Sequence, residues 1–110
     1  MIVKNLAGRA EFSADAKKMG KVSLGAGAHL YAGLNCFLPG QEHQAHVHAD
    51  QDKMYVVVAG RGVAQIGGEV TEVETGDLIL ATAGVVHGLK NTSTQPFSVL
   101  VVFGPPPDRK

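Results

Sequence analysis

A chain of 110 residues is the size of one domain, and no linker, low-complexity segment or internal repeat divides it. Hydrophobic residues make up 45% of the chain, aromatic residues 5% and charged residues 18%, which is typical of a folded protein and excludes a disordered one. Ten basic and ten acidic residues cancel to a net charge of zero, so there is no broad basic field for nucleic acid or an anionic membrane.

Three further features bear on the cellular location. No apolar run reaches the roughly 18 residues that a membrane-spanning helix needs, so we expect no membrane span. Residues 1–5 lack the apolar core of a signal peptide. The single cysteine, Cys36, cannot form an internal disulfide, and we expect a buried, unreactive thiol. These features predict a reducing, cytoplasmic location.

Glycine is abundant, with 14 residues, and helix-forming runs are scarce, which favours an all-β protein with tight turns. One short helix is expected over residues 14–19, with Ser13 as its N-cap and Gly20 as its end. The glycine pair Gly67 and Gly68 predicts a two-residue hairpin, followed by an acidic edge strand. In chain order, strands are expected over residues 30–38, 53–59, 62–66, 69–74, 78–81, 85–91 and 97–103.

Short strands separated by turn signals at this spacing predict a β-sandwich or barrel. Three consecutive prolines begin at Pro105, and proline cannot donate to a β-ladder. The last strand should therefore stop near Gly104, and residues 105–110 are expected to form a mobile tail.

Among the five histidines, the pair His46 and His48 is the most informative. On a strand, positions two apart point to the same side, so both imidazoles could share one metal ion. His87, on another predicted strand about 40 residues further along, could close the site from a neighbouring strand. Imidazole suits zinc, copper, iron, nickel and similar ions. His43 precedes His46 by three residues, so strand parity predicts it on the opposite face.

Two longer patterns surround these histidines. Residues 40–60 follow G-x5-H-x-H-x4-E-x6-G, except that Lys53 stands in place of the glutamate. Residues 76–91 follow G-x5-P-x-G-x2-H-x3-N, with Thr82 in place of the proline. In this order, the two motifs resemble the signature of the cupin superfamily. The short gap between them resembles the compact single-domain cupins of bacteria.

The resemblance implies a single cupin domain over residues 1–110, an all-β jelly-roll barrel with six to eight strands per sheet and a metal inside its mouth. By motif position, the three histidine ligands would be His46, His48 and His87. Asn91 would hold a turn rather than a metal. The motif glycines would occupy turns with positive φ or close backbone packing: Gly40, Gly60, Gly76 and Gly84.

Proteins that share this pattern usually take a fourth ligand from the glutamate position, where a protonated lysine cannot serve. Three alternatives stay open. A neighbour could supply the ligand: Gln51, which parity places on the side of Lys53, or less favourably Asp52, which would need a bulge. The site could instead hold three histidines and water. Or no metal binds, and Lys53 acts in the pocket as an acid–base group or substrate anchor.

With no tryptophan and few aromatic residues, the cavity should be small and mostly aliphatic, which suits a small organic substrate rather than a polymer. The expected pocket wall consists of Tyr31, Asn35, Phe37, Tyr55, Phe97 and Phe103.

A three-histidine site with open positions can bring O₂ and a chelating enol together, or act as a Lewis acid on a carbonyl. Small cupins that resemble this chain include dioxygenases, cyclases, isomerases and proteins with no assigned activity. We therefore expect an enzyme that binds a divalent metal (Fe, Mn, Ni, Cu or Zn), with oxygenase chemistry favoured over isomerase or cyclase chemistry. The alternative is a non-catalytic ligand-binding or sensing module. A homodimer is also expected, with residues 2–12 available to cross to the partner.

Overall fold

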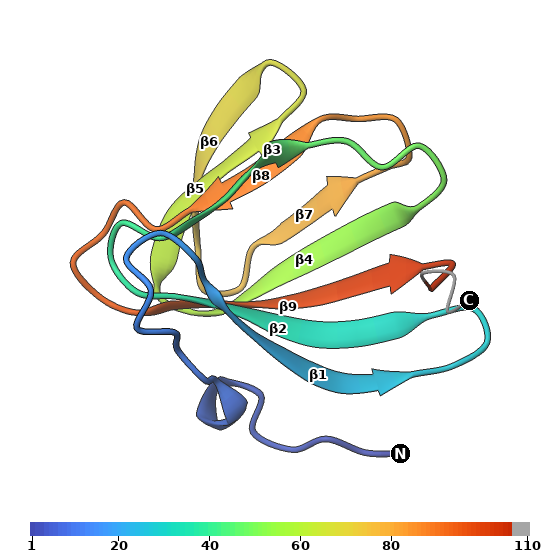
Figure 1. Ribbon diagram of the computed structural model, residues 1–110, viewed down its shortest axis with the longest axis horizontal. Coiled ribbons are helices and arrows are strands. Elements are labelled where there is room, and N and C mark those ends of the chain that lie inside the picture. Colours follow the sequence, from blue (N-terminus) through green and yellow to red (C-terminus); the bar gives the residue numbers. More distant parts are fainter. Residues whose placement is uncertain (107–110) are drawn as a thin grey trace.

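The computed structural model describes residues 1–106, in which nine strands form two antiparallel sheets that face each other (Figure 1). Before them lies one 3₁₀ turn, η1 (Ala7–Arg9). The strands are β1 (Gly20–Ala26), β2 (Tyr31–Phe37), β3 (Glu42–His46), β4 (Asp52–Ala59), β5 (Arg61–Ile66), β6 (Glu69–Glu74), β7 (Leu78–Ala81), β8 (His87–Lys90) and β9 (Phe97–Gly104). This is the all-β architecture that the sequence predicts.

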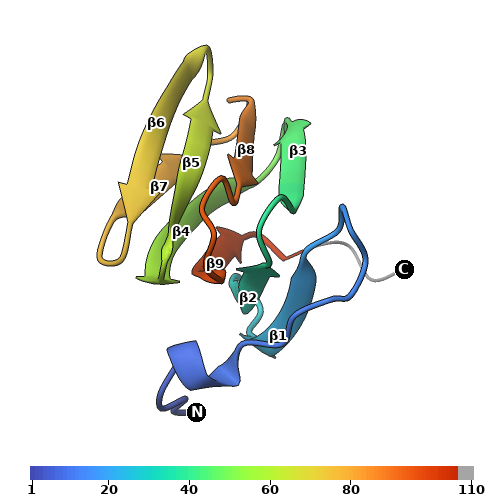
Figure 2. The same cartoon turned by 90° about the vertical axis from the view of Figure 1, so that its left-hand side faces the viewer.

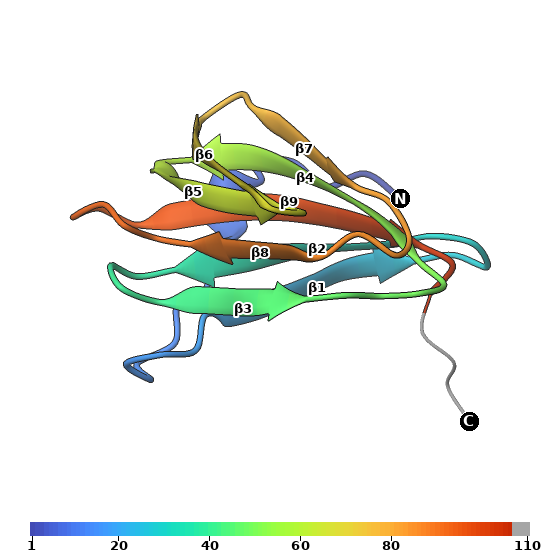
Figure 3. The same ribbon diagram turned by 90° about the horizontal axis from the view of Figure 1, so that it is seen from above.

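One sheet has the strand order β1-β2-β9-β4-β7 and the other β3-β8-β5-β6. Figure 2 shows these two layers side by side, and Figure 3 shows that their strands run roughly along one direction of the molecule. The expectation of six to eight strands per sheet is wrong, because the sheets have five and four. The first strand starts only at Gly20, so nine strands are formed by the rest of the described chain.

The helix expected over residues 14–19 does not form, and the segment is a series of bends. The capping groups close a turn instead: Asp15 Oδ1 accepts hydrogen bonds from the backbone N–H groups of Lys17 at 2.8 Å and Lys18 at 3.2 Å. Gln41 Nε2 donates to the backbone carbonyls of Ser13 and Asp15. A six-residue segment gains too few helical hydrogen bonds to offset nucleation, so these contacts with Gln41 determine its path.

The inner face of the five-stranded sheet is set by its register. Tyr31 of β2 lies opposite Phe103 of β9, and Phe103 lies opposite Lys53 of β4. One row deeper, Val101 lies opposite Tyr55. Because alternate residues face the same side of a strand, the aromatic row that contains Lys53 sits directly beside the core row that contains Tyr55.

Turns fall where the glycines predict them. The hairpin between β5 and β6 turns at Gly67 and Gly68, and β6 is an edge strand, as expected. All four motif glycines have positive φ, between +82° and +97°. At Gly60 a Cβ atom would also lie only 2.2 Å from the carbonyl oxygen of Pro96, so this close approach excludes any side chain.

The C-terminal strand β9 ends at Gly104, as the prolines predict. Of the expected mobile tail, residues 107–110 lie outside the described part of the chain. Within residues 1–106, no helix is both long and apolar enough to cross a membrane.

Candidate metal centre

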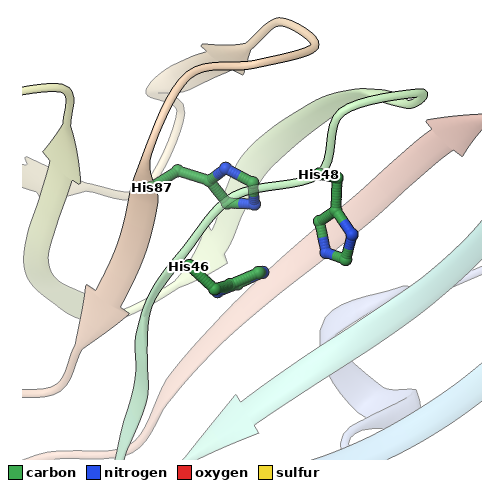
Figure 4. Close-up of side chains that lie close together, drawn as sticks. All are labelled: His46, His48 and His87. Atoms are coloured by element: carbon green, nitrogen blue, oxygen red, sulfur yellow. The ribbon is translucent and has the colours of Figure 1, made fainter.

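Three histidines from two segments of the chain meet between the sheets (Figure 4). His46 ends β3 and lies directly opposite His87, the first residue of β8. His48 follows two residues later, on the connection to β4. One ring nitrogen from each imidazole lies within 4.8 Å of those of the other two. Three nitrogen ligands at this spacing could hold one metal ion, as the sequence predicts.

Backbone carbonyls fix the orientation of two of these rings. His46 Nδ1 lies 2.7 Å from the carbonyl oxygen of Gln44, and His87 Nδ1 lies 3.0 Å from that of Val85. Because a carbonyl only accepts hydrogen bonds, both Nδ1 atoms must carry the proton. The Nε2 lone pairs are then free, and both Nε2 atoms are buried with no hydrogen-bond partner within residues 1–106.

The protonation states also suit metal ligation. Burial lowers the pKa of His87, although the hydrogen bond to Val85 opposes this shift. Burial also lowers the pKa of His48, and the positive charge of Lys53 adds to the effect. Neutral imidazoles are therefore favoured at neutral pH, and only the neutral ring can donate a lone pair to a metal.

The two candidates for a fourth ligand each make a hydrogen bond to the backbone. Gln51 Nε2 donates a hydrogen bond to the carbonyl oxygen of Pro105 at 2.8 Å. Asp52 Oδ1 accepts one from the backbone N–H of Ala83 at 2.8 Å, and Asp52 does not belong to the histidine cluster. The structure therefore brings together the three histidines without Asp52, and Gln51, whose carbonyl oxygen makes no hydrogen bond within residues 1–106, stays a prediction.

Lys53 is buried among aromatic rings, with only 7% of its surface exposed. Its Nζ atom lies 5.1 Å from the ring centroid of Phe103 and 5.8 Å from that of Tyr55. Burial lowers the pKa of Lys53, and the nearby charge of Lys21 lowers it further. Within the described residues, no carboxylate forms an ion pair with Lys53.

His43 lies beside the metal ligands, so the parity prediction for it is wrong. The register between β3 and β8 shifts between His43 and His46, and the ring of His43 stacks on that of His46 with centroids 4.2 Å apart. Its Nδ1 atom is buried without a hydrogen-bond partner in the described chain. Burial and the neighbouring His46 lower the pKa of His43 to about 3. The bulge that turns His43 inward leaves no simple pattern in the sequence.

A cavity of about 290 Å³ lies against the five-stranded sheet, and His43, which stacks on His46, forms part of its wall. Three residues of the expected pocket wall line it: Tyr31, Asn35 and Phe103. Lys21 and His43 also line the cavity, although the sequence does not predict them as wall residues.

The other three expected wall residues do not line this cavity. Phe37 and Phe97 are fully buried and pack against each other in the core, with ring centroids 5.3 Å apart. The prediction of Phe37 and Phe97 as pocket residues is wrong, because both side chains belong to the buried core cluster. Tyr55 is a core residue whose ring centroid lies 6.2 Å from that of His87, and its hydroxyl has no described hydrogen-bond partner.

Comparison with known proteins agrees with this geometry. The family model described as a cupin domain matches residues 33–103, a segment that contains all three histidines. A crystal structure of a Thermus thermophilus protein is 34% identical, with a TM-score of 0.90, and the match covers 97% of this chain and 100% of that chain. A Klebsiella pneumoniae protein with a double-stranded β-helix domain is 25% identical, with a TM-score of 0.84, over 94% of this chain and 89% of that chain.

Two curated proteins are similar in sequence. An uncharacterized protein of Streptomyces coelicolor is 37% identical over 78 residues, which are 71% of this chain and 72% of that protein. Gentisate 1,2 dioxygenase 1 of Aquipseudomonas alcaligenes is 33% identical over 67 residues, 61% of this chain. That match spans only 19% of the dioxygenase, so the similarity concerns one part of a much longer protein.

Proposed function

This chain belongs to the cupin family, and from that premise we propose that it is a metal-dependent enzyme acting on a small organic molecule. The observation that supports this most is that the Nε2 atoms of His46 and His87, two residues paired across β3 and β8, are buried with no hydrogen-bond partner among the described residues. Leaving two acceptors buried and unsatisfied costs about 1–3 kcal/mol each, so a fold keeps such atoms where a ligand completes them.

Each residue of the cluster has a separate role in this proposal. His46, His48 and His87 hold the ion, and the carbonyls of Gln44 and Val85 keep two of the rings in the ligating tautomer. The bound metal would supply redox chemistry toward O₂ if it is iron, manganese, nickel or copper, or Lewis-acid activation of a carbonyl if it is zinc.

The rest of the pocket excludes water and positions the substrate. The rings of Tyr31 and Phe103 stack with centroids 4.7 Å apart and form an apolar wall of the cavity. A cavity of about 290 Å³ is at the lower end of the range for small-molecule sites, which supports a compact substrate. We favour dioxygenase-type chemistry over isomerase or cyclase chemistry, and the similarity to part of a gentisate dioxygenase supports this choice.

The test is a reaction screen on protein loaded separately with each of the five metals. Oxygen uptake is followed with small enolic and aromatic acids, and carbonyl isomerisation is followed by NMR. We expect turnover with one redox-active metal and its loss in His46→Ala, while His29→Ala, which changes an exposed histidine, retains it. Metal-dependent turnover without oxygen uptake would replace the oxygenase assignment with Lewis-acid chemistry.

One observation favours a second candidate, a non-catalytic ligand-binding module. Lys53 places a positive charge in the pocket, where repulsion of a divalent ion opposes metal binding. A binding module would retain its ligand after chelation and would show no turnover with any of the metals. An enzyme would lose its turnover after chelation, so the same screen distinguishes the two.

A further inference from the structure

The cavity lined by His43, whose ring stacks on that of His46, carries charged side chains of positive sign only. Its wall includes Lys21, His43 and Lys53, and no aspartate or glutamate is among its lining residues. Lys53 comes from β4 and Lys21 from β1, on opposite sides of β2 and β9 in the same sheet. Two basic side chains that converge on a small cavity produce a positive potential that an anion would neutralise.

The polar groups of this wall lack partners inside the protein. Lys53 is 7% exposed and Asn35 is 5% exposed. Within residues 1–106, neither side chain makes a hydrogen bond or an ion pair with another side chain. Neither the Lys53 ammonium nor the Asn35 amide is among the fully buried side-chain atoms that lack partners, so both groups open onto the cavity that they line. A donor from Lys53 and an amide from Asn35 are therefore available to one ligand.

The remaining wall is apolar and partly aromatic. Phe103 lies opposite Tyr31 across the two strands, and their rings stack. The Nζ atom of Lys53 lies over the Phe103 ring, so the charge and the apolar surface adjoin. Inorganic anions would leave this aromatic surface unused, whereas an organic acid would use both parts of the wall.

We propose that the cavity binds the carboxylate group of a small organic acid through Lys53, with Lys21 and Asn35 beside it, while the apolar body of the acid lies against Tyr31 and Phe103. That the acid is the substrate of the histidine cluster rests on the proposed function. The binding of the acid by the cavity does not depend on a bound metal. Charge-assisted hydrogen bonds from an ammonium to a carboxylate are strong enough to select for the acid over its amide.

The experiment measures binding of benzoate, of its neutral analogue benzamide and of inorganic phosphate. Zinc-loaded and chelator-treated proteins are titrated by calorimetry and by two-dimensional NMR of the backbone amides. We expect benzoate to bind at least about tenfold more tightly than either of the other probes, because only benzoate offers both a carboxylate and a flat apolar body. The amide shifts should concentrate at Lys21, Asn35 and Lys53.

Three variants identify the groups involved. Lys53→Met keeps the length and apolar stem of the side chain but removes the charge, and we expect it to weaken benzoate binding at least about tenfold. Lys21→Met changes an exposed strand position and provides an independent test should Lys53→Met fold poorly. Lys4→Met removes an exposed lysine that does not line the cavity, so benzoate binding should not change.

Two results would overturn the inference: equal binding of benzoate and benzamide, or unchanged benzoate binding in both Lys53→Met and Lys21→Met. Phosphate binding as tightly as benzoate would overturn the assignment to an organic acid. Failure of the proposed function has a different signature, in which the protein binds benzoate through Lys53 but holds no metal. That result would leave the carboxylate site standing.

Discussion

At the scale of single residues, buried polar side chains follow two opposite patterns. Asn91 is 0% exposed, yet its amide donates to the carbonyls of Phe37 and Gln95 and accepts from Ser93. By contrast, the buried side-chain atoms without partners in the described chain belong to His43, His46, Tyr55 and His87. Unsatisfied polar groups that gather in one place indicate a ligand site rather than structural defects.

Asn91, whose hydrogen bonds are all made inside the protein, should stabilise the fold. Asn91→Ala leaves the Phe37 carbonyl without its buried donor and removes the side chain that closes the loop after β8. We expect the free energy of unfolding to fall by about 2–3 kcal/mol, measured by chemical denaturation. In Asn91→Asp a buried carboxylate oxygen would face the carbonyl oxygens of Phe37 and Gln95, so the free energy of unfolding should fall by at least as much. A loss below about 0.5 kcal/mol, the range of neutral surface changes, would contradict this role for Asn91.

Lys53 should have the opposite effect on stability. Burial lowers the pKa of Lys53 in the folded protein below its ordinary value of 10.5. Between these two pKa values the unfolded chain binds more protons than the folded protein, so the free energy of unfolding rises with pH. At neutral pH the buried ammonium is destabilising, and Lys53→Met should raise the free energy of unfolding by on the order of 1 kcal/mol in metal-free protein. The gain should shrink as the pH rises toward 10.5. Denaturation curves of the wild type, Lys53→Met and Lys4→Met at several pH values test this, and a gain that grows with pH would contradict it.

At the scale of elements, the strands that the sequence predicts best are bounded by turn residues. The bounds of β6 and β7 match the prediction, because the glycines at 67, 68 and 76 fix both ends of β6 and the start of β7. The sequence does not predict β1, and it indicates β3 only through the spacing of its histidines, without bounds. Both are edge strands, and β3 (Glu42–His46) has no apolar alternation because its inward positions carry histidines. Their pairing comes from neighbouring strands, which a local pattern cannot show.

The candidate site follows the same division. His46, His48 and His87 were predictable because motif spacing and strand parity do not depend on the rest of the fold. The inward position of His43 depends on a register shift, and the place of the exposed Lys21 at the cavity wall depends on a strand that the sequence does not reveal. The expected helix over residues 14–19 does not form for a similar reason. Gln41, which is distant in the sequence, donates hydrogen bonds to the backbone carbonyls of Ser13 and Asp15 and holds this segment in a non-helical path.

The bulge in β3 depends on a glycine in the facing strand. A Cβ atom on Gly88 would lie 2.9 Å from the backbone nitrogen of Ala45 and 3.0 Å from the carbonyl oxygen of His43. Gly88→Ala should therefore push β3 away from β8 and separate His46 from His87. We expect metal affinity to fall about 10–100-fold while the fold remains, as measured by competition with a chromophoric chelator.

The matched control for this substitution is Gly68→Ala in the β5–β6 hairpin. Among residues 1–106, no heavy atom beyond the neighbouring residues lies within 4 Å of a Cβ placed at Gly68, so the metal affinity of Gly68→Ala should equal that of the wild type. An unchanged affinity in Gly88→Ala would show that the close approach of the two strands does not hold the histidines in place.

At the scale of the whole molecule, the expected homodimer remains a prediction. The edge strands β6 and β7 carry exposed apolar side chains at Val70, Leu78 and Leu80, and such surfaces favour association. Size-exclusion chromatography with light scattering should give twice the mass of one chain across a range of dilutions. A single-chain mass at every concentration would contradict the expectation.

Metal content tests most directly whether the three histidines form one metal site, on which the proposed function depends. Untagged wild type, His48→Ala and the exposed control His29→Ala are loaded with metal, freed of excess and analysed for metal per chain. We predict close to one ion per chain in the wild type and in His29→Ala, and almost none in His48→Ala, because each ligand contributes to one shared site. A wild type that holds no metal after loading, or a His48→Ala variant that holds as much as the wild type, would contradict this prediction.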